Sequence, residues 1–79
     1  MKISEYIFSE YKILTNKYVA ASQQLREMLP RFAKLPQTEK VPTSKTCKEL
    51  LRDLDTVEEE IEGALTRLRN IRHRLLELV

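Results

Sequence analysis

The chain has 79 residues, of which 42% are apolar and 33% are charged, with one Gly, three Pro and no Trp. A chain of this size can fold but cannot bury a deep core, which excludes most enzyme architectures. The formal net charge of +2 is too small to indicate a nucleic acid or a membrane as partner. The single Cys47 cannot form an intramolecular disulfide, and the apolar runs are too short for a membrane span. We therefore expect a cytoplasmic protein, with the nucleus as the alternative.

Apolar residues in the first part of the chain follow the spacing of an amphipathic helix. One series recurs every seven residues and takes heptad position d: Ile7, Leu14, Ala21, Met28 and Leu35. A second series follows four residues later and takes position a: Tyr11, Tyr18, Leu25 and Phe32. This alternation predicts a helix over residues 3–35 with one apolar seam.

Pro30 lies within this predicted helix, at position f on the face opposite the seam. A proline removes one backbone hydrogen bond, so we expect a kink in a continuous helix that keeps its seam. The alternative is a helix that ends at Leu29, followed by a short piece that carries Phe32 and Leu35. Turn-forming residues then cluster over 36–45, which we predict to be the linker.

A second helix is predicted over residues 46–79. Its a positions are Cys47, Leu54, Ile61, Leu68 and Leu75, and its d positions are Leu50, Val57, Ala64, Ile71 and Leu78. Thr46 and Glu49 have the spacing of a capping box, in which each side chain satisfies a free backbone N–H. Ser44 and Thr43 are the alternative caps.

The two predicted helices are of similar length, and a short linker favours antiparallel packing. Pairing Ile7 with Leu75 sets a register in which each a residue faces a d residue, as far as Leu35 and Cys47 at the turn. The same register places Glu10 near Arg67 and Arg74, Lys17 near Glu60, and Arg31 near Asp53. Gly63 is expected to make room for Tyr18, unless it is only a tolerated helix-interior glycine. The predicted fold class is an all-α, antiparallel two-helix coiled-coil hairpin, completed to a bundle by self-association or by a partner.

A further apolar edge lies outside the predicted seam, mainly at position e. We predict it to be a partner interface, made of Phe8, Val19, Leu29, Leu51, Leu65, Leu76 and Val79. Thr15 and Ser22 interrupt the edge in the first helix. The alternative is that these residues only widen the intramolecular seam. A second interface is possible at Ile3, Tyr6 and Ile13, unless these are isolated apolar residues on a solvated face.

Residues that could support catalysis or metal binding are scattered. Cys47 and His73 lie at opposite ends of one predicted helix, and Cys47 is expected to be a small buried residue. His73 and Glu77 have i,i+4 spacing without a third ligand nearby. The acidic run Glu58–Glu60 spreads around its helix rather than converging. We therefore expect no catalytic, cofactor-binding or metal-binding residues, and no enzyme activity.

The sequence thus predicts a helical protein–protein interaction module, a small structural or adaptor subunit whose partners are helices of another protein or of further copies. The first alternative is a small cytoplasmic chaperone that shields an amphipathic helix of a client. A nucleic-acid-binding module that uses Arg69 and Arg72 is the weaker alternative, because no aromatic residue interleaves with the arginines.

Overall fold

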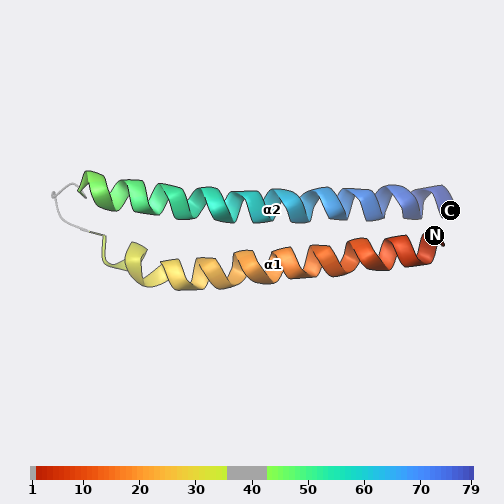
Figure 1. Ribbon diagram of the computed structural model, residues 1–79, viewed down its shortest axis with the longest axis horizontal. Helices are drawn as coiled ribbons and strands as arrows, with labels where there is room; N and C mark the ends of the chain where they lie inside the picture. Colours follow the sequence, from red (N-terminus) through yellow and green to blue (C-terminus); the bar gives the residue numbers. More distant parts are fainter. Residues whose placement is uncertain (1, 36–42) are drawn as a thin grey trace.

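The computed structural model describes residues 2–35 and 43–79, which form two antiparallel helices. Helix α1 spans Ile3–Ala33 and helix α2 spans Ser44–Leu78. The helices lie side by side along their whole length, and both termini of the chain lie at the same end (Figure 1). The molecule measures 57 × 17 × 17 Å. The prediction of an all-α helical hairpin is confirmed, and the described residues contain no strand.

Helix α1 is continuous through Pro30 and ends at Ala33, whereas the sequence predicted an end at residue 35. The N–H of Lys34 donates to the carbonyl of Pro30 at 3.1 Å, which closes the last turn. Pro30 has no N–H to donate to the preceding turn, and the last turn departs from the line of the helix (Figure 1).

Helix α2 begins at Ser44, and its N-cap is Thr43 rather than Thr46. The hydroxyl of Thr43 accepts a hydrogen bond from the N–H of Thr46 at 3.2 Å and lies 2.8 Å from the Thr46 hydroxyl. This bond satisfies a free backbone donor and lengthens the helix at its start. The predicted cap at Thr46 was therefore wrong, and the alternative at Thr43 is the one observed. Most of the predicted linker, residues 36–42, lies outside the described residues.

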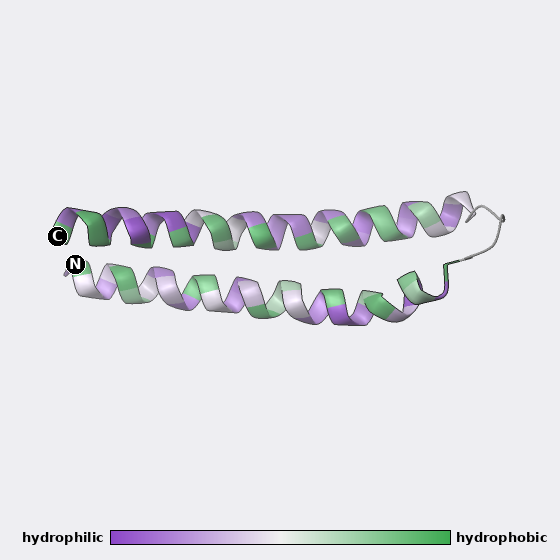
Figure 2. Cartoon of the chain, turned by 180° about the vertical axis from the view of Figure 1, so that it is seen from behind, coloured by the Kyte–Doolittle hydropathy of each residue, from purple (hydrophilic) through white to green (hydrophobic). Residues whose placement is uncertain are grey.

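The core of the hairpin consists of d residues. Ala21, Met28, Leu50 and Val57 are buried, and Met28 is only 1% exposed. Toward the end of the hairpin that holds the chain termini, four d residues are half-buried: Ile7, Leu14, Ala64 and Ile71. Leu78, the last d residue, is 59% exposed. Hydrophobic and hydrophilic positions alternate along both helices (Figure 2).

The predicted seam was wrong in its other half, because the a residues face solvent. Tyr18 is 68% exposed and Tyr11 is 53% exposed, while Ile61 at the same position of α2 is 49% exposed. Cys47, which we expected to be buried, is exposed as well. A helix with a single neighbour is covered on one side only, and here that side is centred on d and g. The a residues are consequently turned outward and only partly covered by the other helix.

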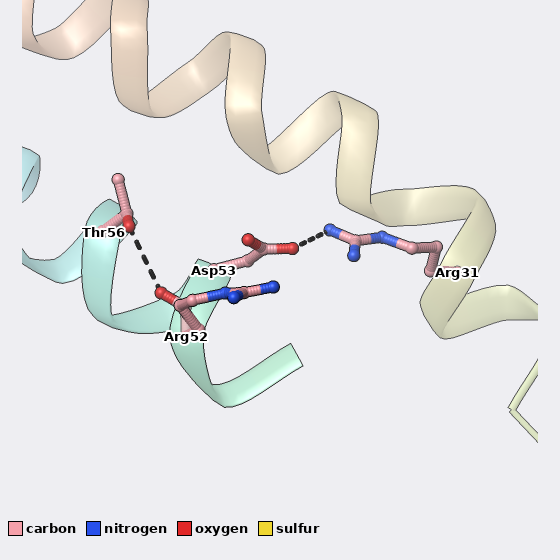
Figure 3. A network of polar contacts seen from close by, with 4 residues as sticks. All are labelled: Arg31, Arg52, Asp53 and Thr56. Atoms are coloured by element: carbon pink, nitrogen blue, oxygen red, sulfur yellow. Dashed lines mark hydrogen bonds and ion pairs between the residues drawn. The ribbon is translucent and has the colours of Figure 1, made fainter. Parts of the chain in front are cut away.

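Charged residues at position g line one edge of the hairpin and account for this rotation. Arg67 Nη1 lies 3.2 and 3.1 Å from the two carboxylate oxygens of Glu10, and Lys17 Nζ lies 3.9 Å from Glu60 Oε2. Arg31 forms an ion pair with Asp53 (Figure 3). These three predicted neighbours are confirmed. We call this row of ion pairs the charged edge.

Two details of the charged edge differ from expectation. Arg74 binds Glu77 at 3.2 Å and lies over the ring of Tyr6, so it does not pair with Glu10. Gly63 makes room for Lys17 rather than for Tyr18, since a Cβ at Gly63 would lie 2.7 Å from Lys17 Cδ. The absence of a side chain at Gly63 lets the Lys17 stem cross α2 toward Glu60.

Candidate protein-binding face

The side of the hairpin opposite the charged edge is largely apolar, and we call it the open face. Thr15 and Ser22 on α1 and Glu58 and Arg72 on α2 interrupt it. It is built from exposed a and e residues of both helices: Phe8, Tyr11, Tyr18, Leu25, Leu29 and Phe32 on α1, and Leu51, Leu54, Ile61, Leu65, Leu68, Leu75 and Val79 on α2. Because a and e lie next to each other on a helix, the exposed residues form one stripe along each helix. The two stripes lie side by side and together form one surface.

A groove runs along the middle of the open face, between the two stripes. It is lined by Tyr11, Leu14, Thr15 and Tyr18 of α1 and by Ile61, Ala64, Leu65 and Leu68 of α2. The groove has a volume of about 450 Å³. Thr15 and Ala64 are small, whereas the other lining residues are large. This shape receives an apolar side chain that projects from another helix.

A second apolar groove lies at the C-terminal end of α2. It is lined by Leu68, Ile71, Leu75, Leu76 and Val79, with Arg72 at its side. This groove continues the open face to the end of the hairpin. The apolar surface is thus longer than the buried core and extends beyond it toward the termini.

The structure places every residue of the predicted partner interface at the surface. Phe8, Leu29, Leu51, Leu65 and Val79 lie within the open face, while Val19 and Leu76 at position b lie at its outer rims. Leu29 is 67% exposed and Leu65 is 41% exposed, so they do not widen the intramolecular seam. Their role as an interface remains a prediction.

The second predicted interface is only partly available. Ile3 is exposed, whereas Tyr6 and Ile13 are half-buried. The Arg74 guanidinium lies 5.1 Å from the centroid of the Tyr6 ring, so this ring already contacts α2. This contact between the ring and a cation stabilises the end of the hairpin at which the chain termini lie. A role for these three residues in binding a partner stays a prediction.

The polar side chains that could have supported chemistry take part in local contacts. His73 Nε2 lies 3.1 Å from Glu77 Oε1, and Glu77 also accepts from Arg74. The described residues hold no group of three side chains that could bind a metal ion. Arg69 and Arg72, the candidates for nucleic-acid binding, are exposed.

Sequence reasoning missed the a residues of the open face, which it assigned to the hairpin core. The signal was present in the width of the apolar pattern: a, d and e together span more than a two-helix seam covers. Exposed tyrosines at a fit this, because Tyr carries a hydroxyl that favours a partly wet interface over a closed core. The pattern is that of helices with two apolar neighbours rather than one.

Within residues 2–35 and 43–79, neither helix has a stretch apolar enough to cross a bilayer. No family model, no curated protein and no solved structure matches the chain. The open face is therefore the feature of the molecule that points most directly to a function.

Proposed function

We propose that this hairpin is a protein–protein interaction module, a small structural or adaptor subunit that docks helices on its open face. The observation that carries the proposal is the row of exposed a and e residues along both helices. Apolar patches of this extent on small proteins usually mark interaction sites. The proposed compartment is the cytoplasm, with the nucleus as the alternative.

The accessible surface of the chain supports the need for a partner. A compact monomer of 9.3 kDa exposes about 5,000 Å². The hairpin exposes 6665 Å² and buries few large side chains completely. Covering the open face would remove apolar surface from water at about 25 cal/mol per Å². Association is thus the most direct way for this chain to gain the burial that its own core lacks.

A chaperone that shields an amphipathic client helix is the second candidate. The central groove between Tyr18 and Leu65 favours it, since a single helix could insert its apolar ridge there. A permanent subunit stays bound to its partner, whereas a chaperone releases its client. Exchange of a labelled bound partner against unlabelled chain separates the two candidates, because only the chaperone exchanges during its working cycle.

Site-specific photocrosslinking in the source cell tests the proposed function. A photoreactive phenylalanine analogue at Tyr18, in the open face, should form covalent adducts with another polypeptide. The same analogue at Glu59, an exposed residue at position f, should form few or none. Equal adduct yields at the two positions would contradict a role for the open face.

The matched variant is the double substitution Leu51→Glu with Leu65→Glu. It leaves every d residue in place, so circular dichroism should show unchanged helicity. Adducts from the Tyr18 position should disappear, because two unpaired carboxylates would have to be buried on docking. Adducts that persist in a helical double variant would count against the proposal.

A further inference from the structure

The width of the open face distinguishes between classes of partner, and the choice among them rests on the proposed function. A single helix docked between α1 and α2 would cover the a residues on both sides of the central groove. It would leave the outer residues in water, including Phe8, Leu29 and Leu51 at position e and Val19 and Leu76 at position b. All five are exposed by more than half in the hairpin. Covering them requires a partner that is two helices wide.

We propose that this partner is a second copy of the chain, and that two hairpins pack face to face as a four-helix bundle. A second copy has an apolar face of the required width and length. The hairpin is 57 Å long and 17 Å wide, which corresponds to a footprint of about 970 Å². Each partner of a stable complex typically buries about 800 Å². The long side of the hairpin, of which the open face is the apolar part, is thus of the size that one partner of a stable dimer buries.

The position of one copy relative to the other follows from which residues of α1 and α2 lie at the same height along the long axis of the hairpin. Lys17 crosses α2 at Gly63, so these two residues lie at about the same height along the hairpin. The same holds for any residue of α1 and residue of α2 whose numbers add up to about 80. A two-fold axis parallel to the helices keeps every residue at its height. It places α1 of one copy against α2 of the other, antiparallel, without any choice of register.

In this arrangement three of the four e residues of α1 meet suitable e residues of the second copy, and the fourth, Phe8, lies opposite its Arg72. Leu29 lies opposite Leu51 of the second copy, and the small Thr15 lies opposite its Leu65. Ser22, which interrupts the apolar edge of α1, lies opposite Glu58 of the second copy, which interrupts that of α2. Ser22 thus faces another polar residue, and the small Thr15 leaves room for the large Leu65 side chain.

The charges at the rims of the open face also favour this arrangement. Arg26 faces Asp55 and Glu58 of the second copy, and Glu5 faces its Arg72. The unfavourable neighbours are Lys12 near Arg69 of the second copy, and the apolar Phe8 and Val19 near its Arg72 and Glu62. All of these charged residues are exposed in the hairpin, and Lys12 Nζ lies 4.9 Å from the centroid of the Phe8 ring.

When the two hairpins overlap along their full length, a two-fold axis perpendicular to the helices gives a poorer match. It places α1 against α1 and α2 against α2, so that Lys12 faces Arg26 of the second copy and Glu62 faces its own counterpart. Glu58 would then lie opposite Leu65, and Leu51 opposite Arg72. Apolar residues would meet charged ones at both positions, so the charged groups would be desolvated without a polar partner to compensate. Among the e positions, the parallel axis leaves one apolar residue, Phe8, opposite a charged residue, whereas the perpendicular axis leaves two, Leu51 and Leu65.

Sedimentation equilibrium of the purified full chain tests the second copy as occupant. The expected mass is twice that of the 9.3 kDa chain. The Leu51→Glu, Leu65→Glu variant should fall to the mass of one chain and keep its helicity. The control pair Glu59→Lys and Thr66→Lys, at exposed f positions, should remain dimeric. A wild-type chain that stays at 9.3 kDa across a wide concentration range overturns the dimer. The photocrosslinking at Tyr18 decides the proposed function separately, so the two failures are distinguishable.

The native Cys47 tests the arrangement within the dimer. Around a parallel axis the two Cys47 residues lie at the same end of the bundle, on diagonally opposed helices, at a positions that face its centre. Mild oxidation or a short bis-maleimide should give a covalent dimer that is absent from Cys47→Ser and from the Leu51→Glu, Leu65→Glu variant. Around a perpendicular axis the two thiols lie at opposite ends of a 57 Å molecule. A non-covalent dimer that yields no such product overturns the parallel arrangement.

Discussion

Glu10 is the one charged side chain that is buried among the residues the structure describes, with 6% of its surface exposed. Its carboxylate accepts from Arg67 through both oxygens, at 3.2 and 3.1 Å. Arg67 itself is more exposed, with 36% of its side chain accessible. Glu10 therefore forms the buried side of this ion pair, and Arg67 remains partly exposed to solvent. A buried carboxylate depends on such a partner because its desolvation is otherwise uncompensated.

Removing the partner of Glu10 should cost more than removing an exposed ion pair. We expect Arg67→Met to lower the free energy of unfolding by about 1–3 kcal/mol, because it leaves a buried carboxylate unpaired. Adding Glu10→Gln to Arg67→Met should recover part of this loss. Asp53→Asn, which breaks the more exposed pair with Arg31, should cost at most about 1 kcal/mol. Urea unfolding followed by circular dichroism measures all four proteins, and equal losses for Arg67→Met and Asp53→Asn would contradict the burial argument.

At the scale of the helix, the apolar residues at positions d and a have different neighbours. The d residues pack inside the hairpin, as Met28 shows with 1% exposure. The a residues lie in the open face, where Leu25 is 46% exposed. One helix thus carries an intramolecular contact and a contact surface for a partner side by side. The two contacts should respond differently to truncation.

We expect Met28→Ala to lower the free energy of unfolding by about 2–5 kcal/mol at any chain concentration, because it opens a cavity in the hairpin core. Leu25→Ala should lower the free energy of unfolding only slightly when the chain is dilute. The loss should grow as the chain concentration rises, since burial of Leu25 depends on docking. Thermal unfolding at several concentrations measures both. A concentration-independent loss for Leu25→Ala as large as that of Met28→Ala would place the a residues in the hairpin core instead.

The whole molecule is one layer of two helices without a covering layer among the residues described. Domains are normally built from two packed layers around a shared core. Here the described part of the chain supplies one layer, and the open face is the side on which a second would pack. This explains why a chain with strongly periodic helices buries so few residues completely.

A stability that depends on association should depend on concentration. We expect the thermal midpoint of the wild-type chain to rise with chain concentration, because mass action favours the associated and folded state. The Leu51→Glu, Leu65→Glu variant should show a lower midpoint that does not move with concentration. The Glu59→Lys, Thr66→Lys control should behave like the wild type. Calorimetry over a dilution series makes the measurement, and a wild-type midpoint that does not change would show that folding gains nothing from docking.

Local patterns by themselves determined the helices, their antiparallel pairing and the charged edge. The heptad positions of Met28 and Val57 predict burial, and complementary charges at Glu10 and Arg67 specify the register. The apolar residues of the e edge, such as Leu51, were also identified from spacing alone. These features depend on periodicity within a helix and on the order of charges along it, both of which a linear sequence displays.

Only the tertiary structure decided how each helix is rotated about its own axis. A repeat with apolar a, d and e positions is compatible with two arrangements. The helices can contact each other through positions a and d, or through positions d and g. The charged edge and the crossing of Lys17 over Gly63 select the second. That rotation turns Tyr11, Tyr18 and Leu68 outward and makes one broad open face. The physical reason is that rotation depends on the sum of weak contacts along two helices, which spacing in one chain does not reveal.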